Sequence, residues 1–430
     1  MPTGSKVFFR HLERLLEGGG TPEELARRLA PRREETPPAF PGGARVTEEA
    51  LGRRWKRLGS AEAEAVLCDG WTRERCEGFA RNVENFVGTV KLPVGIAGPL
   101  RVNGLFARGD YLVPLATTEA ALVASHHRGA CLVTAAGGCS SALLNESVNR
   151  SPAFGFRSMA ESGSFVHWVL SRIETFQGLV SETSRHARLL DVGFMGEGNH
   201  VYLNFQYSTG DAAGQNMVTI ATQRIVDHIL AESPFRPAEV YIEGNLSGDK
   251  KASAQAFNTV RGKKVSSEIR LPAELVGKYL HTTPKAMADY WKMSAIGGVL
   301  SGTLGVQGQY ANGLAALFIA TGQDAACVAE SAAGVTRFEV DAEGGLYAAV
   351  TLPNLVVGTV GGGTGLPSQR ACLEILGLAG AGGAAPFAEL CGAVVLAGEL
   401  SLIGALAAGE FTRAHRKLAR RAAEPGSGSA

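Results

Sequence analysis

The feature that most constrains the fold is a change in composition and hydrophobic pattern between residues 152 and 242. Beyond this segment the chain is rich in glycine and alanine, with runs such as "SAIGGVLSGTLG" and "GLAGAGGAAP". Within it, "SFVHWVLSRIETFQGLV" predicts a helix, "HARLLDVGFMG" and "NHVYLNFQYS" predict a hairpin, "DAAGQNMVTIATQRIVDHILAE" predicts a second helix, and "AEVYIEG" predicts a returning strand. This αββαβ order predicts a small α+β domain inserted into a larger one.

The segments on either side complete the predicted organisation. Residues 47–82 favour helix, because "TEEALGRRWKRLG" begins with a Thr cap and early acids. "ENFVGTVKLPVGIAGPL" predicts short strands interrupted by Pro and Gly, and "TTEAALVASHHRGACL" predicts a helix. We therefore expect an N-terminal helical segment (1–83), a large domain made of 84–151 and 243–430, and a small domain (152–242).

Composition excludes several classes of protein. The formal net charge of the 430 residues is +1, which gives no case for nucleic-acid or membrane binding. From the sequence, no apolar run is expected to approach the roughly 20 residues needed to cross a bilayer, and no signal peptide is visible. Seven scattered cysteines without a CxxC pair favour a reduced, cytoplasmic protein, and no metal site is predicted.

A glycine-rich loop, "GTVGGGTG", follows the strand-like run "YAAVTLPNLVV" and precedes a helical pattern. At such a turn, backbone N–H groups can hold a phosphate or pyrophosphate. The spacing is not GxGxxG, so the dinucleotide fingerprint is not met. For these glycines, the sequence supports contact with a ligand and tight packing equally.

Two further loops could carry an anion or an oxyanion. In "TGDAAGQNM", Asp211 and Gly214 are predicted in the first turn of a helix, either as an anion site or as an ordinary N-cap. In "EGNLSGDKKAS", a lysine that stabilises a developing oxyanion would need a carboxylate nearby. A solvated turn is the alternative for "GDKK".

Three single residues are candidates for proton transfer. Glu119 in "LATTEAAL" and Asp324 in "FIATGQDAACVA" are lone acids in apolar segments, and buried acids are rare and perturbed. His415 lies on the final predicted helix beside cations, where a solvated helix end is the alternative.

The combination of these motifs, in this order, closely resembles the 3-hydroxy-3-methylglutaryl-CoA (HMG-CoA) reductase family. The resemblance covers roughly residues 84–430 and also includes "GELSLIGALAAG" and the late histidine. It is closest to the branch with the eukaryotic and archaeal enzymes. It implies an α+β fold, with a large helical and mixed substrate domain, an inserted small ferredoxin-like NADP-binding domain and a helical N-terminal segment. It also implies a homodimer or a dimer of dimers, with the active site at the subunit interface.

The family reduces HMG-CoA to mevalonate and coenzyme A with two NADPH, through a hemithioacetal and an aldehyde. The resemblance gives Lys250 the role of holding the carbonyl oxygen as it becomes negative. Glu119 matches the acid that supplies a proton during aldehyde reduction, which requires a raised pKa. Asp324 matches the acid that links the two, and His415 matches the histidine that protonates the departing thiolate.

The same resemblance assigns the ligand-binding residues. Arg185 matches an arginine that meets the 2′-phosphate, which favours NADPH over NADH. The residues implied for NADPH are Ser184, Arg185, Asp211, Gly214, Asn216, Met217, Val360, Gly361 and Gly362. The residues implied for the acyl-CoA are Glu84, Arg128, Arg150, Glu243, Asn245, Asp249, Lys251, Lys292, Gln309 and Asn312.

The sequence departs from the family pattern in the acyl pocket. Glu243 stands where the family has a serine that contacts the substrate carboxylate, and Gln309 replaces a histidine. The matched catalytic residues are present, but the acyl pocket is predicted to be altered. Three functions stay open: an HMG-CoA reductase proper, a reductase of a related acyl-CoA, and a catalytically silent homologue that binds CoA and NADP.

Overall fold

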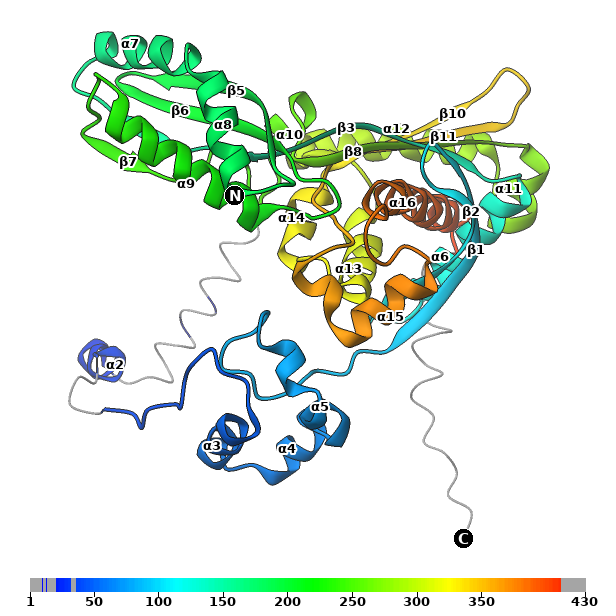
Figure 1. Cartoon of the computed structure of the whole chain (residues 1–430). Coiled ribbons are helices and arrows are strands. Elements are labelled where there is room, and N and C mark those ends of the chain that lie inside the picture. Colours follow the sequence, from blue (N-terminus) through cyan, green and yellow to red (C-terminus); the bar gives the residue numbers. More distant parts are fainter. Residues whose placement is uncertain (1–9, 11–12, 14–20, 32–35, 411–430) are drawn as a thin grey trace. The chain divides into compact units, whose positions relative to one another are not determined.

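The computed structural model describes residues 10, 13, 21–31 and 36–410. Contacts along the chain divide it into two compact units, Met1–Thr89 and Val90–Ala430. Figure 1 shows both units, and each is described here by itself.

The first unit is helical, as the sequence predicts. Its elements are α2 (Pro22–Leu29), α3 (Glu48–Leu58), α4 (Ala61–Leu67), α5 (Gly70–Glu74) and the 3-10 helix η1 (Cys76–Phe79). Thr47 caps α3 as expected. The buried Arg54 guanidinium donates hydrogen bonds to four backbone carbonyls, those of Pro41, Gly43, Arg45 and Phe86. These bonds satisfy the buried charge and hold the loops around α3.

The second unit combines one extended sheet with helices. Its strands are β1 (Val94–Gly104), β2 (Arg108–Ala116), β3 (Cys139–Arg150), β4 (Ala153–Gly155), β5 (Arg188–Glu197), β6 (His200–Ser208), β7 (Glu239–Tyr241), β8 (Gly262–Leu271), β9 (Gly305–Val306), β10 (Gly334–Val340) and β11 (Leu346–Leu355). Its helices are α6 (Leu122–Ala135), α7 (Met159–Leu170), α8 (Ile173–Thr183), α9 (Gln215–Glu232), α10 (Gln255–Asn258), α11 (Ala273–Leu280), α12 (Pro284–Ser301), α13 (Tyr310–Thr321), η2 (Ala325–Cys327), α14 (Val328–Ser331), η3 (Gly362–Gly365), α15 (Pro367–Ile375) and α16 (Ala384–Ala407). The fold class is α+β, as predicted.

Strand β3 joins two parts of the sheet. The strand order is β7-β4-β6-β3-β8-β11-β10-β9, with β1 beside β2 and β3, and β5 beside β6. Residues 140–147 of β3 pair with β8, while residues 148–150 pair with β6 in the segment 152–242. One continuous strand therefore connects the segment 152–242 to the rest of the unit.

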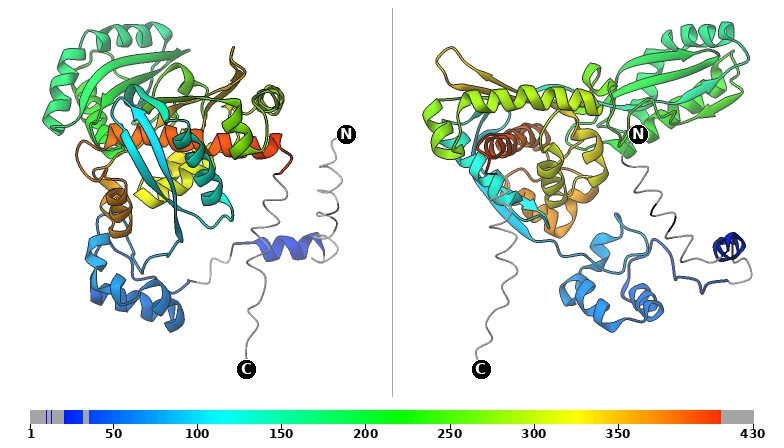
Figure 2. Two further views of the ribbon diagram at one scale, coloured as in Figure 1. Left: turned by 90° about the vertical axis from the view of Figure 1, so that its right-hand side faces the viewer. Right: turned by 180° about the vertical axis from the view of Figure 1, so that it is seen from behind.

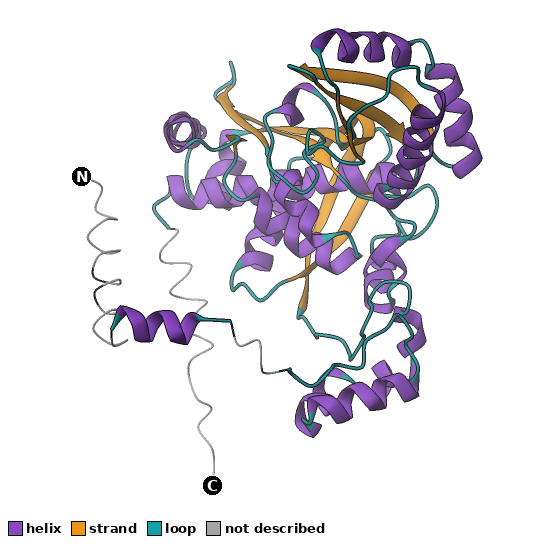
Figure 3. Ribbon diagram, turned by 90° about the vertical axis from the view of Figure 1, so that its left-hand side faces the viewer, coloured by secondary structure: helices purple, strands orange, loops and turns teal. Residues whose placement is uncertain are grey.

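The segment 152–242 has its own hydrophobic cluster, which includes Phe154, Phe165, Phe176 and Phe205. Its helices lie against its strands (Figure 3). The predicted hairpin is present as β5 and β6, paired in antiparallel register from Arg188 to Glu197. The single helix predicted from "SFVHWVLSRIETFQGLV" is instead two helices, because the chain turns at residues 171–172, where the Ser171 hydroxyl bonds the Trp168 carbonyl. The short strand β4 was not predicted.

Helix α16 forms the centre of the larger hydrophobic cluster and packs against α6, α13, β3, β8 and β11 (Figure 2). A Cβ on Gly129 of α6 would lie 1.9 Å from the Ala397 carbonyl oxygen, so this helix contact requires glycine. The sequence analysis found no run suited to a membrane, yet α16 is long and apolar enough by length and composition. Because 83% of its apolar window is buried inside the structure, it has the property of a core helix.

Candidate active site

The loop after β7 brings a lysine and an aspartate together. Lys250 Nζ lies 2.9 Å from Asp324 Oδ2, and the two side chains are 42% and 41% exposed. The hydrogen bond that Lys250 donates to Asp324 raises the pKa of Lys250, so the amine stays protonated. Lys250 therefore has the nearby carboxylate that the oxyanion role requires.

The structure corrects the expectation that Glu119 and Asp324 are buried. Glu119 is exposed in the turn between β2 and α6, where Thr118 and Ala120 are exposed too, and the buried apolar residues belong to the flanking elements, Leu115 and Ala116 to β2 and Leu122 to α6. Asp324 is exposed at the N-cap of η2, where its Oδ1 accepts the N–H of Ala326 at 3.0 Å. Among the residues that the structure describes, the fully buried carboxylates are Glu330, Glu389 and Glu399.

A network of charges surrounds the lysine loop. Arg150 Nη1 lies 3.1 Å from Glu243 Oε2 and 3.2 Å from Asp249 Oδ2. Glu243 Oε1 also accepts the N–H of Asn245 at 2.7 Å. The carboxylate of Glu243, the residue that departs from the family pattern, therefore has its ion-pair and hydrogen-bond partners within its own chain.

Two residues that the sequence analysis missed complete this network. The buried guanidinium of Arg261 bonds both carboxylate oxygens of Glu330 at 2.6 Å, and its Nη2 lies 2.7 Å from Asp249 Oδ1. Burial raises the pKa of Glu330, and the charge of Arg261 opposes that shift. Glu330 is a lone acid in "ACVAESAAGV", so the criterion that selected Glu119 would have found it.

We define the Lys250 cluster as Arg150, Glu243, Asp249, Lys250, Lys251, Arg261, Asp324 and Glu330. It contains four cations and four carboxylates, so these charges balance within one chain. Lys251 is exposed, and its Nζ donates to the Asp249 carbonyl at 2.8 Å.

A second group forms around Glu119. Its Oε1 accepts from Asn312 Nδ2 at 3.5 Å, and both line a pocket of ≈ 320 Å³. Gln309 caps α13 just before Asn312, its side-chain amide bonds the Gly398 carbonyl, and its N–H donates to buried Glu399 at 2.6 Å. Within the described part of the chain, no hydrogen bond or ion pair joins this group to the Lys250 cluster.

The glycines of the glycine-rich loop have two kinds of surroundings. A Cβ on Gly358 would lie 2.5 Å from the Ala213 nitrogen, so this glycine packs against the chain. Gly361 and Gly362 have φ of 75° and 55°, are exposed, and a Cβ there would meet nothing within 4 Å. Tight packing therefore applies at Gly358, while contact with a ligand stays a prediction for Gly361 and Gly362.

Asp211 does not lie in the first turn of a helix, as the sequence predicted. Helix α9 begins at Gln215 after Gly214, which is its N-cap with φ 80°. The Asp211 carboxylate instead accepts the N–H groups of Gly382 and Ala384, at 2.8 and 3.1 Å, where α16 begins. Asp211 caps a distant helix because the loop 211–213 folds back onto the glycine-rich loop.

The other residues expected to bind NADPH lie on the segment 152–242 or on the glycine-rich loop. Ser184 ends α8, and its hydroxyl accepts the N–H groups of His186 and Ala187. Arg185 is exposed beside it. Asn216 and Met217 stand in the first turn of α9, and Val360 is exposed on the glycine-rich loop.

The remaining residues expected to bind the acyl-CoA are dispersed in this chain. Arg128 on α6 is half-buried and donates to the hydroxyl and the carbonyl of Ser401 at 3.0 and 2.6 Å. Lys292 on α12 is 68% exposed and lies 3.5 Å from Asp289 Oδ1. Glu84 is exposed in the first unit. His415 lies outside the described residues. Among the residues that the structure describes, no group of three or more metal-binding side chains is found.

Comparisons with known proteins identify the family of this chain. The family model "Hydroxymethylglutaryl-coenzyme A reductase" matches residues 55–420. The 3-hydroxy-3-methylglutaryl-coenzyme A reductase of Aeropyrum pernix is 44% identical over 384 residues, covering 87% of this chain and 90% of the relative. The corresponding protein of Pyrococcus horikoshii is 43% identical over 350 residues, covering 80% of this chain and 84% of the relative.

A solved structure supports the fold. The chain is similar to the class II 3-hydroxy-3-methylglutaryl-CoA reductase of Streptococcus pneumoniae bound to NADPH, with a TM-score of 0.62 and 19% identity. The match covers 84% of this chain and all (100%) of that one. By the family model over most of its length and by its archaeal relatives, this chain belongs to the hydroxymethylglutaryl-coenzyme A reductase family.

Proposed function

We propose that this protein reduces HMG-CoA to mevalonate and coenzyme A, with two NADPH as the source of hydride. The observation that carries the proposal is the ion pair of Lys250 with Asp324 at 2.9 Å, which provides a protonated amine at an exposed position. The two archaeal relatives are named for this activity, and this chain matches them over most of their length.

In the first reduction, Lys250 binds the thioester carbonyl oxygen. As hydride reaches the carbonyl carbon, negative charge develops on that oxygen, and the Nζ–H groups stabilise it. The resulting hemithioacetal breaks its C–S bond to give the aldehyde, and the thiolate of coenzyme A leaves. The proton for this thiolate is assigned to His415.

In the second reduction, the aldehyde oxygen again lies against Lys250. A second hydride converts the carbonyl carbon into an alcohol carbon, and the oxygen takes a proton. Glu119 is assigned as the donor of that proton, because its carboxyl lines a pocket and is oriented by Asn312. Asp324 keeps Lys250 charged through both steps.

NADPH supplies the hydride when bound, and the residues present fit such a group. Gly361 and Gly362 leave open space beside an exposed backbone, and α9 presents its N-terminal N–H groups next to Gly214. The exposed Arg185 is available for the 2′-phosphate. The segment 152–242 is thus proposed as the NADP-binding domain, with Ser184, Asn216, Met217 and Val360 nearby.

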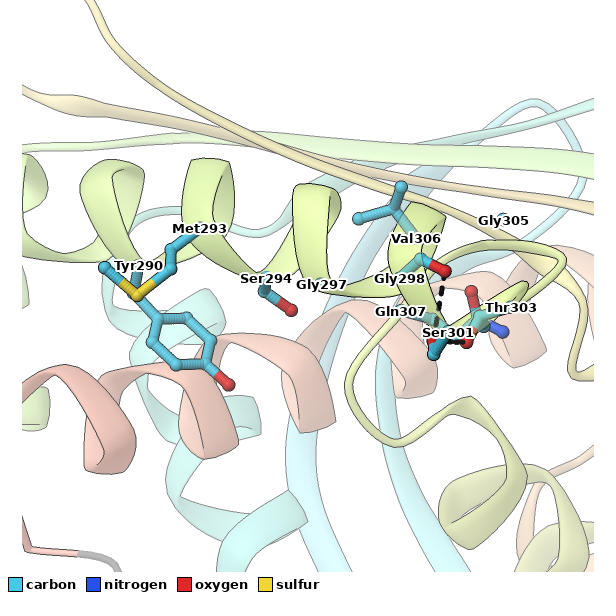
Figure 4. A pocket seen from close by; sticks show the side chains of 10 residues that line it. All are labelled: Tyr290, Met293, Ser294, Gly297, Gly298, Ser301, Thr303, Gly305, Val306 and Gln307. Carbon is cyan, nitrogen blue, oxygen red and sulfur yellow. Dashed lines mark hydrogen bonds between the residues drawn. The ribbon is translucent and has the colours of Figure 1, made fainter. Parts of the chain in front are cut away.

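We propose a homodimer or a dimer of dimers in which a second copy completes the site. Lys292 is 68% exposed and lies 3.5 Å from Asp289, and its helix α12 exposes Met293, Ile296, Val299 and Leu300. Beside this stripe lies a pocket of ≈ 340 Å³. Figure 4 shows Tyr290, Met293 and Ser294 along α12, with Ser301 at its end and Thr303 and Gln307 just beyond it.

An exposed apolar stripe of this kind marks an interface, and docking there would give Lys292 a partner's acyl group to bind. Sedimentation velocity should therefore show a dimer or tetramer at micromolar concentration. A monomer with full activity would contradict the proposal.

Glu243 supports a second candidate substrate, an acyl-CoA that lacks a free carboxylate. Two like charges about 4 Å apart repel by roughly 4 kcal/mol at an effective dielectric near 20. Since Arg150 already neutralises Glu243, the repulsion is reduced, but that arginine is no longer free to bind the substrate carboxylate. Gln309, bonded to Gly398, is the other departure from the family pattern.

A substrate screen decides between these candidates. We expect NADPH oxidation with HMG-CoA, two NADPH consumed per mevalonate, and little oxidation of NADH. Glu243→Ser should lower the KM for HMG-CoA about tenfold, because it removes one of the two carboxylates that pair with Arg150 and so strengthens the pull of Arg150 on the substrate carboxylate. Higher kcat/KM of the unaltered enzyme for an uncharged acyl-CoA, reversed by Glu243→Ser, would establish the second candidate. No turnover of any acyl-CoA would refute the proposed activity.

A further inference from the structure

Lys250 has an unusual backbone. Its φ is 57°, in the left-handed region that non-glycine residues rarely adopt. A lysine in this conformation persists when surrounding groups hold it, and such positions gather at functional sites. The question is which groups hold the main chain of Lys250.

The main chain of Lys250 is held by a buried carboxylate. Glu330 Oε1 accepts the Lys250 N–H at 3.1 Å, and Glu330 is 0% exposed. Arg261, 2% exposed, bonds both oxygens of this carboxylate and also bonds Asp249, the residue before Lys250. The peptide between Asp249 and Lys250 is therefore held from both sides, through a side chain and through an N–H.

The same short segment also holds the lysine side chain. Asp324 caps η2, and η2 continues directly into α14, which carries Glu330. One end of segment 324–331 thus pairs with Lys250 Nζ, and the other end with the Lys250 N–H. Because both anchors belong to one segment, the main-chain anchor sets where the amine can lie relative to Asp324.

We propose that Arg261 and Glu330 are positioning residues for Lys250. They hold the Asp249–Lys250 peptide in its left-handed conformation, so that Nζ lies against Asp324 and faces the reacting carbonyl oxygen. Neither residue needs to touch the substrate, since both are buried. The inference rests on the proposed role of Lys250 in reduction.

The test removes both charges at once, in the double variant Arg261→Gln/Glu330→Gln of the full chain. Replacing a buried ion pair by uncharged groups is often neutral for stability, whereas removing one partner strands a charge. We expect a melting temperature near that of the unaltered enzyme. At saturating HMG-CoA we expect kcat to fall about tenfold to hundredfold, because a charged anchor of Lys250 is lost.

The affinity for NADPH, followed by its fluorescence, separates positioning from damage to the fold. It should change less than about threefold, because no residue assigned to NADPH is altered. Glu389→Gln is the matched control, since Glu389 is also 0% exposed and accepts backbone N–H groups, those of Phe106, Ala107 and Leu143. This control should lower stability and leave kcat unchanged.

The outcomes are distinguishable from failure of the proposed function. A folded double variant with kcat within twofold of the unaltered enzyme, while Lys250→Ala is inactive, overturns the positioning role alone. Activity retained by Lys250→Ala overturns the role of the lysine itself. If the double variant does not fold, Arg261→Lys replaces it, because an ammonium cannot bond Glu330 and Asp249 as the guanidinium fork does. That variant should lose about tenfold in kcat, and full kcat there overturns the inference.

Discussion

Replacing Lys250 with alanine is expected to lower kcat about a thousandfold. Loss of one neutral oxyanion donor typically lowers kcat by roughly a hundredfold to a thousandfold, and Lys250 is charged. The side chain is 42% exposed, so its removal leaves no cavity in the core. The N–H of residue 250 can still donate to Glu330, so the loop keeps its anchor. Steady-state NADPH oxidation with HMG-CoA measures the loss.

Lys251→Ala is the matched control for this variant. Lys251 Nζ donates to the Asp249 carbonyl and makes no pair with Asp324, although it is the next residue in the loop. It is proposed to contact the acyl carboxylate, so its loss should raise the KM for HMG-CoA and change kcat far less. Equal losses of kcat in both variants would show that loop charge, and not Lys250 itself, supports the reaction.

Asp324→Asn is expected to lower kcat about a hundredfold, the second largest effect. An asparagine oxygen can still accept the Ala326 N–H, so the cap of η2 is retained. What is lost is the charged partner 2.9 Å from Lys250 Nζ, which aims the amine and keeps it protonated. A folded Asn variant with normal kcat would remove Asp324 from the mechanism.

The same variant should change the pH profile in a defined direction. The active lysine is protonated, and Asp324 raises its pKa, so activity persists as pH rises and falls only near the raised pKa. Without the carboxylate, the pKa of Lys250 moves back down toward its ordinary value. The alkaline limb of kcat should therefore shift to lower pH. A limb that stays in place would assign it to another group.

Local patterns predicted much of the fold. The hairpin of β5 and β6, the Thr47 cap and the α+β class were all confirmed, since periodicity and capping are properties of neighbouring residues. The predictions that failed had two different causes. Asp211 caps α16 and not α9, which depends on a distant contact. The helix predicted over residues 164–180 is broken by a local turn at residues 171–172.

The exposure of the acidic side chains also depended on the tertiary structure. The sequence criterion for functional acids was a lone carboxylate in an apolar run, taken as a sign of burial. Asp324 and Glu119 were selected by this criterion and are exposed. Glu330 also satisfies the criterion but was not selected, and it is buried. An apolar run determines that its helix or strand is buried, but the position of one acid at a turn or in a helix determines its own exposure.

By itself, the sequence determined the residue types available for chemistry and their order along the chain, which identify the family. Only the tertiary structure decided how the charges combine. Residues 150, 249, 261 and 330 are far apart in the chain, yet the folded loops place their charges 2.6 to 3.2 Å apart around Lys250. Whether Glu243 repels a substrate or pairs with Arg150 also depended on that arrangement. The physical reason is that the energy of a charge depends on distance and burial, and distant parts of the chain set both.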